Sequence, residues 1–564
     1  MQINKISVQP YNSKEQPQGV SLNKNQTPSF GNGVDLFLNF LDTQQAVGAC
    51  VVDLGSMVIP RSTVDFINRG PSAGAETARR EAMGTTNHAT VGVDGLLVGS
   101  ALALGLNSKY GIKAHKIFAD DATISFVTKS WHNALHDSGA EDPLKKHVDT
   151  FVDNIKTFNP SAEWAQDGYA SIKEADKLEI KDFLYRKLKS ANGKALGKKE
   201  CEALFAMITA ATGGEKEAIL DAKAVGERVN AVDNLKNMIS NFSKITEACQ
   251  SEKVKEAFMN TAEFGKNEVV KSLKHLNLRR TIGGLAIATT IGMSTQPVNM
   301  YLTKKKTGQD GFPADPDRKK DRSVGFKILK TLTGLAFATG ALATITTKPS
   351  KFLSKIQFQG WLPTIDQLKL VYGLTITSRL FVARDKDELR ESLVKDTLGF
   401  LNLLILGSLV TKGVARAFDK TLINKGKNFL SSSLKTRAEV LMPAMKKYGK
   451  SLLKADGSPL KFNEMLKLVK ELPEQEQKIL KKQLGALNWS QFIGYLYSGV
   501  VLGVGIPKLN IYMTNKAAAR RERERLAAAD SQNQDIEKTT KDNDPNFSSN
   551  SKRLSFEDKQ FIIK

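Results

Sequence analysis

The sequence predicts an all-α protein in which several apolar, membrane-type helices are combined with soluble helical domains between disordered termini. Windows almost free of charge occur in a chain whose mean hydropathy, -0.28, is that of a soluble protein. The charged regions between them place apolar residues at helical spacing. We find no alternating β-branched runs of the kind that an all-β fold needs. At 564 residues, the chain is long enough for more than one folding unit.

The clearest apolar window, Thr281 to Thr303, has no charged residue and is long enough to cross a hydrocarbon layer of ~30 Å. We predict that its basic flanks contact phosphate headgroups. The flanking residues are Arg279, Arg280, Lys304, Lys305 and Lys306. Further windows are Thr331 to Thr347, Thr397 to Thr411 and Gly485 to Pro507. All four carry small residues at close intervals, which suits helices packed inside a bilayer. Buried helices of a large soluble domain are the alternative interpretation.

Two weaker apolar stretches, Ala46 to Pro60 and Ala89 to Leu106, are each interrupted by one carboxylate, Asp53 or Asp94. A carboxylate inside a membrane is costly and usually faces a partner, a cavity or an ion path. If the stretches are soluble helices instead, which we favour, the carboxylates are expected to be half-exposed or paired with a nearby arginine. The candidate partners are Arg61, Arg69, Arg79 and Arg80.

The remaining chain divides by composition. The predicted order is a disordered polar leader (1–33), an N-terminal apolar helical region (34–135), a soluble charged helical domain (136–278), membrane-type helices with a basic loop at 304–330 (279–411), a basic amphipathic helical insert (412–484), the last membrane-type helix (485–516), and a charged helix with a disordered tail (517–564). Within 279–411, the alternating charges from Ser378 to Glu391 predict a salt-bridged helix at the membrane surface.

The charge balance favours anionic partners. There are 82 Lys and Arg against 59 Asp and Glu, which gives a formal charge of +23. Aromatic residues make up only 7% of the chain and are not interleaved with the basic ones, as base stacking would require. An anionic lipid membrane is therefore the predicted partner, and nucleic acid is the second choice among anionic partners. Protein partners are a further prediction. The odd number of separated cysteines indicates neither a disulfide framework nor a zinc site.

A short pattern occurs twice. Asn299, Tyr301 and Thr303 recur in the same spacing as Asn510, Tyr512 and Thr514, and each copy follows a Gly-rich apolar window with a nearby proline. Paired broken helices in two halves mark substrate sites in transporters. The favoured interpretation is simpler: Tyr301 and Tyr512 anchor helix ends at the membrane interface.

No catalytic motif is found, and we predict no enzyme activity, no cofactor and no metal. His132 and His136 are four residues apart, as a helical metal site would need, but Asn133 stands where a zinc protease carries Glu. The pair is interpreted as adventitious.

Four blocks carry a family resemblance: Ile59 to Pro71, Glu76 to Ala89, Ala383 to Ser392 and Lys395 to Gly407. They resemble patches of uncharacterised multi-span helical membrane proteins of gut-dwelling bacteria. The resemblance covers a minor part of the chain and implies a multi-pass protein of the bacterial inner membrane with cytoplasmic helical domains, but no activity. The leading hypothesis is an interaction, scaffold or membrane-organising protein. The alternatives are a transporter or channel-like protein, and a soluble basic protein that binds nucleic acid.

Overall fold

The computed structural model describes residues 37–38, 53–308 and 320–543, apart from short gaps within these ranges. The gaps are 161, 215–216, 262, 361, 403–405, 425–428, 430–431, 452–453, 455–459 and 461. Helix accounts for 77% of the structure and strand for 4%, so the all-α prediction is confirmed. The expected leader at 1–33 and the end of the expected tail lie outside the described residues.

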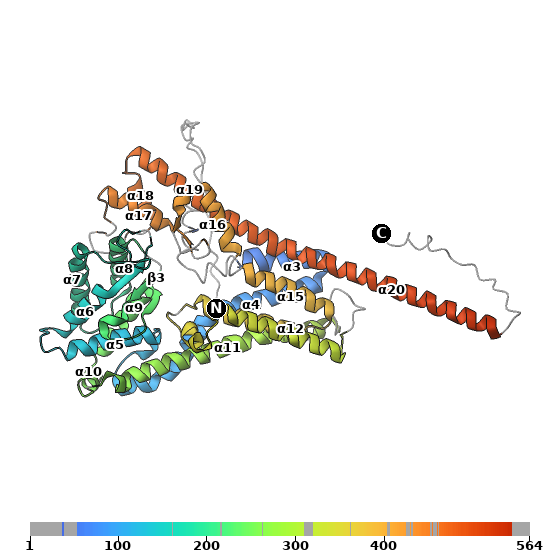
Figure 1. Cartoon of the computed structure of the whole chain (residues 1–564), viewed down its shortest axis with the longest axis horizontal. Helices are drawn as coiled ribbons and strands as arrows, with labels where there is room; N and C mark the ends of the chain where they lie inside the picture. Colours follow the sequence, from blue (N-terminus) through green and yellow to red (C-terminus); the bar gives the residue numbers. More distant parts are fainter. Residues whose placement is uncertain are drawn as a thin grey trace, which may run out of the picture.

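Two helices of 40 residues, α4 (Pro71–Tyr110) and α11 (Glu268–Thr307), form the spine of the molecule (Figure 1). They run antiparallel: Arg79 near the start of α4 donates to Asn299 near the end of α11, while Lys109 and Glu268 pair at the opposite end. The chain between them folds into a separate domain, which we call the inserted domain (residues 111–267). At 1.5 Å per residue, each spine helix is ~60 Å long, twice the thickness of a hydrocarbon layer.

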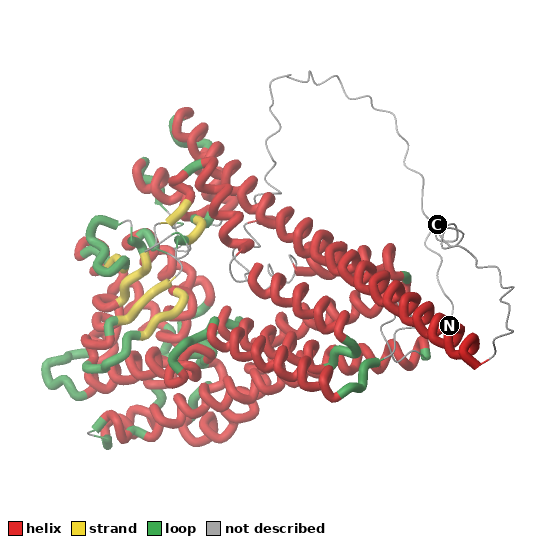
Figure 2. The backbone as a smooth tube through the Cα atoms, turned by 45° about the vertical axis from the view of Figure 1, so that its right-hand side comes forward, coloured by secondary structure: helices red, strands yellow, loops and turns green. Residues whose placement is uncertain are grey.

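The inserted domain surrounds a four-stranded antiparallel sheet with helices. Its helices are α5 (Asp121–Leu135), α6 (Pro143–Asn154), α7 (Glu174–Ser190), α8 (Lys198–Thr212), α9 (Leu235–Cys249) and α10 (Glu252–Met259). The strands, in sheet order, are β2 (Tyr169–Ser171), β1 (Ile155–Phe158), β3 (Glu217–Leu220) and β4 (Ala231–Asn234). Figure 2 shows this sheet at one end of a largely helical molecule. Its core includes fully buried Phe151, Phe242 and Ile155.

The sheet was not predicted, and the inserted domain begins before the predicted boundary at residue 136. The strands have three or four residues each, which is too short for an alternating pattern to stand out from helical periodicity. The domain also includes α5, which packs on α6 and α9 although it precedes the expected boundary at residue 136. Apolar residues of α5, such as Phe126 and Trp131, belong to the core of the inserted domain.

Further helices pack along the spine to form a bundle. They are η1 (Leu54–Val58), α3 (Ile59–Arg69), α12 (Val324–Ala343), α13 (Phe352–Ile356), α14 (Ile365–Phe381), α15 (Lys386–Leu401), α16 (Gly407–Phe418), α19 (Glu474–Ser498), η8 (Gly499–Gly505) and α20 (Ile506–Asn543). Here η1 and η8 are π-helical turns. Helix α14 lies against α11 and α12, α15 lies against α14 and α20, and α16 lies against α19.

Shorter elements complete the chain. They are α17 (Arg437–Lys447), α18 (Phe462–Val469), the two-stranded ladder of β5 (Ile423–Asn424) with β6 (Ser433–Leu434), and 3-10 turns at Ala114–Lys116, Ala222–Val225, Phe264–Lys266, Pro349–Lys351 and Lys420–Leu422. Helix α17 packs on α18 and α19, around a small core of its own that includes Leu441 and Leu487. The expected insert at 412–484 is thus a helical unit, with β5 and β6 as its only strands among the described residues.

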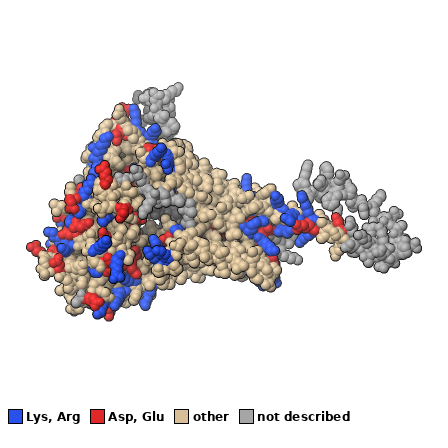
Figure 3. Space-filling view, viewed as in Figure 1, with Lys and Arg blue, Asp and Glu red and all other residues tan. Residues whose placement is uncertain are grey.

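The outer face of the bundle is apolar. Large side chains remain exposed on several helices, among them Leu97 and Leu104 of α4, Ile282 of α11, and Leu332 and Leu335 of α12. Figure 3 shows a belt without charged side chains over the bundle, with Lys, Arg, Asp and Glu gathered on both sides of it. Contiguous exposed apolar surface of this extent is rare on soluble proteins and is typical of an interaction or membrane surface. We call this surface the apolar belt.

Three helices are long and apolar enough to cross a membrane: Pro71–Tyr110, Val324–Ala343 and the continuous helix Glu474–Gln532. They contain the windows Ala89 to Leu106 and Gly485 to Pro507 and most of Thr331 to Thr347. The window expected to be clearest, Thr281 to Thr303, lies in α11, which is not one of the three. Polar residues on its packed face, including buried Thr295, Gln296 and Asn299, explain why. Thr397 to Thr411 is divided between α15 and α16.

Candidate functional site

A cavity of 420 Å³ lies where three stretches of the bundle meet. The first is η1, the second is the end of α15 at Asn402, and the third is the α19–η8 junction at Ser498. The stretches touch closely: a side-chain carbon on Gly503 of η8 would collide with the carbonyl oxygen of Ser56 in η1. Single π-helical turns occur frequently at functional sites, because they free backbone and side-chain groups from regular helical spacing.

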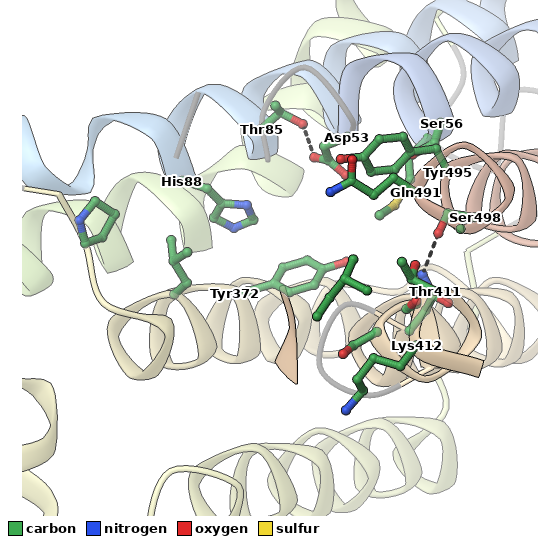
Figure 4. Close-up of a pocket in the computed structure, with 18 residues that line it drawn as sticks. Asp53, Ser56, Thr85, His88, Tyr372, Thr411, Lys412, Gln491, Tyr495 and Ser498 are labelled. Atoms are coloured by element: carbon green, nitrogen blue, oxygen red, sulfur yellow. Dashed lines mark hydrogen bonds between the residues drawn. The ribbon is translucent and has the colours of Figure 1, made fainter. Parts of the chain in front are cut away.

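The exposed area of the cavity wall is mostly apolar, although many of its side chains also carry a polar group (Figure 4). Asp53 and Thr85 face each other across one side, and the Thr85 hydroxyl donates to the Asp53 carboxylate. Tyr372 of α14 meets the ring of His88 edge-on, with 4.9 Å between ring centroids. This mixture of apolar walls and a few placed polar groups is typical of small-molecule sites.

Two further polar residues of the wall, Asn402 and Lys412, have different hydrogen-bond partners. Asn402 donates from Nδ2 to the Ser498 hydroxyl at 3.3 Å, but its buried Oδ1 has no hydrogen-bond partner. Lys412 is the only Lys or Arg among the described lining residues, and its Nζ donates to the carbonyl oxygens of Phe429 and Ser432, each at 3.1 Å. The ammonium charge of Lys412 is therefore directed into the wall, away from the cavity centre.

A cluster of buried ion pairs lies behind the cavity, between α3, α4, α14 and α15. Glu81 is its centre, since Arg61 at 3.4 Å, Arg80 at 3.2 Å and Lys395 at 3.2 Å all approach its carboxylate. Arg379 and Asp396 form a separate pair at 3.2 Å, with side chains only 5% and 1% exposed. These groups, which we call the Glu81 cluster, join helices that are more than 300 residues apart in the chain.

The charged interior continues toward the end of the bundle opposite the inserted domain. Arg69 of α3 bonds to Glu391 of α15 at 2.7 Å, and Arg384 bonds to Glu76 of α4 at 2.8 Å and to Glu388 at 2.9 Å. The run from Ser378 to Glu391 is thus salt-bridged, as expected, but it is not a surface helix: Arg384 is 2% exposed and Glu388 is 5% exposed. Sequence patterning could not show this, because alternating charges look the same on a surface and in a paired interior.

Burying so many charges is expensive unless each is paired, and a hydrophobic interior would serve stability as well or better. The bundle thus combines an apolar exterior, a charged interior and a cavity beside the π-helical turns η1 and η8.

The two carboxylates singled out from the sequence have different places. Asp53 is half-buried and lines the cavity. Asp94 is buried on α4, faces the crossing with α11 at Gly284, and has an Oδ2 atom without a hydrogen-bond partner. Asp53 therefore meets the expectation of a half-exposed carboxylate, whereas Asp94 is buried, and among the described residues neither carboxylate pairs with the four candidate arginines. Arg61 and Arg80 pair with Glu81, Arg69 pairs with Asp65 and Glu391, and Arg79 bonds to Asn299 and Thr303.

The predicted headgroup contact of Arg280 is also wrong. Its side chain is fully buried and its guanidinium donates to the carbonyl oxygens of Ile117 at 2.5 Å and His115 at 3.1 Å, above the ring of Phe118. Arg280 instead joins α11 to the start of the inserted domain. Its neighbour Arg279 is exposed, as are Lys304, Lys305 and Lys306 at the far end of α11. Tyr301 and Tyr512 are 64% and 62% exposed, which is compatible with the predicted interfacial position.

The repeated pattern has matching contacts. Asn299 donates to the carbonyl oxygen of Glu76 at 2.9 Å, and Asn510 donates to that of Glu391 at 3.1 Å. The threonines match as well, because Thr303 accepts from Arg79 and Thr514 accepts from Arg390. Each copy therefore joins a long helix to the charged start of a neighbouring helix: the end of α11 to α4 in one case, and the start of α20 to α15 in the other. The copies do not line the cavity.

His132 and His136 stack in the inserted domain at 4.2 Å between centroids, and each bonds to a backbone carbonyl. Within the described residues, no group of three or more His, Cys, Asp or Glu is placed to hold a metal ion. Comparisons of the chain with protein-family models, with curated proteins and with solved structures found no match.

Proposed function

We propose that this protein is an integral membrane protein that binds a polar solute in the cavity beside Asp53 and Asn402 and carries it across the membrane. One observation supports this above the others: an interior of buried ion pairs leads away from a cavity beside the π-helical turns η1 and η8, inside a bundle whose exterior is apolar. Transporters place binding sites near the middle of the membrane, where helices depart from regular geometry. The Glu81 cluster would hold the helices in register around the cavity.

The membrane part of the proposal is tested by extraction of the full chain from cell membranes with salt, alkaline carbonate and detergent. We expect release by detergent alone. Replacing Leu332 and Leu335 with Asp puts two charges on the exposed face of α12, at ~2.5–3.5 kcal/mol each near the membrane centre, and is expected to reduce the carbonate-resistant fraction. Leu178→Asp, at a position in the inserted domain that is exposed to an even greater degree, is the control and should change nothing. Release of the wild type by salt alone would contradict insertion and favour nucleic-acid or lipid-surface binding.

The transport part is tested in proteoliposomes with three solute panels of matched size, namely amines, carboxylates and neutral polar compounds. We expect uptake from at least one panel that protein-free liposomes lack. Absence of uptake from all three would contradict transport while leaving the membrane assignment intact.

A second candidate, an interaction or scaffold role, is favoured by the last part of α20. This helix runs beyond the bundle, and residues 520–532 are exposed and charged. A chain ending after Arg521 keeps the ion pair of Arg521 with Asp387 of α15 and removes the remainder of the projecting helix. If this chain still transports but loses protein partners in crosslinking, both roles belong to one molecule.

A further inference from the structure

We infer that the solute is an organic cation with an ammonium group that donates hydrogen bonds to Asp53 and Asn402. This inference rests on the proposed function, because it specifies the ligand of the same cavity. It starts from the acceptors. Among the described residues, Asp53 is the only acid that lines the cavity, and its carboxylate forms no salt bridge there. Its one hydrogen bond comes from Thr85, which leaves acceptor capacity on both oxygens.

Asn402 supplies the second acceptor. Its amide nitrogen is occupied by Ser498, and this orients Oδ1 as an acceptor that has no partner although the residue is only 5% exposed. A buried polar atom without a partner costs about 1–3 kcal/mol, so a turn of the Asn402 amide that brings Oδ1 to a ligand donor in the cavity is favoured. An ammonium has several N–H donors and no acceptor, and it can satisfy a carboxylate and an amide oxygen together. A carboxylate ligand would instead face two acceptors.

The cations around the cavity do not offset this preference. Lys412 is the only Lys or Arg among the described lining residues, and its ammonium donates to two backbone carbonyls. Arg61 and Arg379 do not line the cavity, so their guanidinium groups are not placed to contact a ligand in it. The remaining wall also suits a cation. Tyr372 and Tyr495 present aromatic rings, which attract cations at their faces, and the volume of 420 Å³ admits an amine with an aromatic or aliphatic body.

The test is a binding measurement on the detergent-solubilised full chain, which does not require transport. The probe is 2-phenylethylamine, compared with 2-phenylethanol and phenylacetate, by ligand-observed NMR up to about 10 mM. We expect saturable binding of the amine, with the alcohol and the acid weaker by about tenfold or more, since a charged hydrogen bond is lost. Equal binding of the three probes, preferred binding of phenylacetate, or no binding of the amine would overturn the inference.

Two variants assign the amine to the cavity. Asp53→Asn should weaken amine binding about tenfold or more while leaving the alcohol unchanged, and Asn402→Asp, which adds a second carboxylate, should strengthen it. The matched control is Asp94→Asn, which removes another buried carboxylate of the bundle that does not line the cavity. If Asp53→Asn fails to fold, the amine affinity of Asn402→Asp tests the site, and it should be higher than that of the wild type. Amine binding that is unchanged in both variants would overturn the site. Amine binding without uptake in proteoliposomes would contradict the transport proposal and leave this inference standing.

Discussion

Glu81 is the counter-charge for three buried cations of the bundle interior, since all three approach its carboxylate. Neutralising it leaves Arg61, Arg80 and Lys395 buried together without a counter-charge. We therefore predict that Glu81→Gln destabilises the protein by about 3–5 kcal/mol, measured by denaturant unfolding in detergent. The double variant Glu81→Gln with Lys395→Met removes one of the uncompensated charges and should recover part of the loss.

The matched control for Glu81→Gln is an exposed ion pair between α4 and α11. Lys109 and Glu268 join α4 to α11 with side chains 62% and 76% exposed, so solvent screens their attraction. Glu268→Gln should leave the unfolding midpoint unchanged. A Glu81→Gln variant as stable as this control would show that the Glu81 cluster does not depend on its central carboxylate.

His147 links the stability of the inserted domain to pH. It is fully buried between Ser130 and Thr246, with hydrogen bonds of 2.9 and 3.0 Å, and burial lowers its pKa to about 3 from 6.5. Below pH 6.5 the unfolded chain binds a proton that the folded domain excludes. Stability should therefore fall as pH decreases from 6.5 toward 3, by at most about 1.4 kcal/mol per pH unit from this residue.

The measurement for His147 is thermal unfolding of the full chain in detergent, followed by tryptophan fluorescence, since the Trp131 ring lies 5.3 Å from His147. Replacing His147 with Gln should flatten the dependence on pH in this range. A variant with the wild-type slope would mean that other groups dominate the acid response.

At the scale of elements, the crossing of α4 and α11 depends on glycine. A side-chain carbon at Gly284 would lie 2.7 Å from the Cα of Gly95, so the two backbones are in contact. We predict that Gly284→Ala costs about 1–3 kcal/mol, because one helix must move. Gly340→Ala in α12 has open space around it and is the control, expected to be neutral or slightly stabilising. Denaturant unfolding in detergent compares the two, and equal effects would contradict the close crossing.

The elements also show what sequence patterning could find. It located the apolar helices and the repeated Asn-x-Tyr-x-Thr segments, since charge exclusion and repetition are local properties of the chain. It placed Asp53 among the candidate residues because a carboxylate interrupts an apolar stretch. It could not show Asn402, whose importance comes from an unpartnered oxygen, nor the Glu81 cluster, whose members meet only when α3, α4 and α15 pack. The prediction for Arg280 was wrong for the same reason. An arginine that flanks an apolar helix and contacts lipid has the same local sequence as one that is buried and bonds to a neighbouring domain.

At the scale of the whole molecule, the spine formed by α4 and α11 has two ends. One end carries the inserted domain, and the other carries Lys305. Helices α4 and α11 are antiparallel, so both connect the inserted domain to the end that carries Lys305. The apolar belt lies between these ends. Basic residues occur at both ends, which is why the positive-inside rule gave no orientation from the sequence. The geometry nevertheless fixes the relative placement: if the belt lies in the bilayer, the two ends lie on opposite sides.

Relative placement can be measured with single cysteines in a background where Cys50, Cys201 and Cys249 are replaced by Ala. Ser138→Cys marks an exposed loop of the inserted domain, and Lys305→Cys marks the exposed end of α11. We predict that a membrane-impermeant maleimide applied to sealed vesicles labels only one of the two, and labels both after detergent is added, because ~60 Å of helix separates them across a layer of ~30 Å. Inverted vesicles should reverse the result. Labelling of both sites in sealed vesicles would place the two ends on the same side, and the apolar belt would then have to cover a protein surface rather than cross a bilayer.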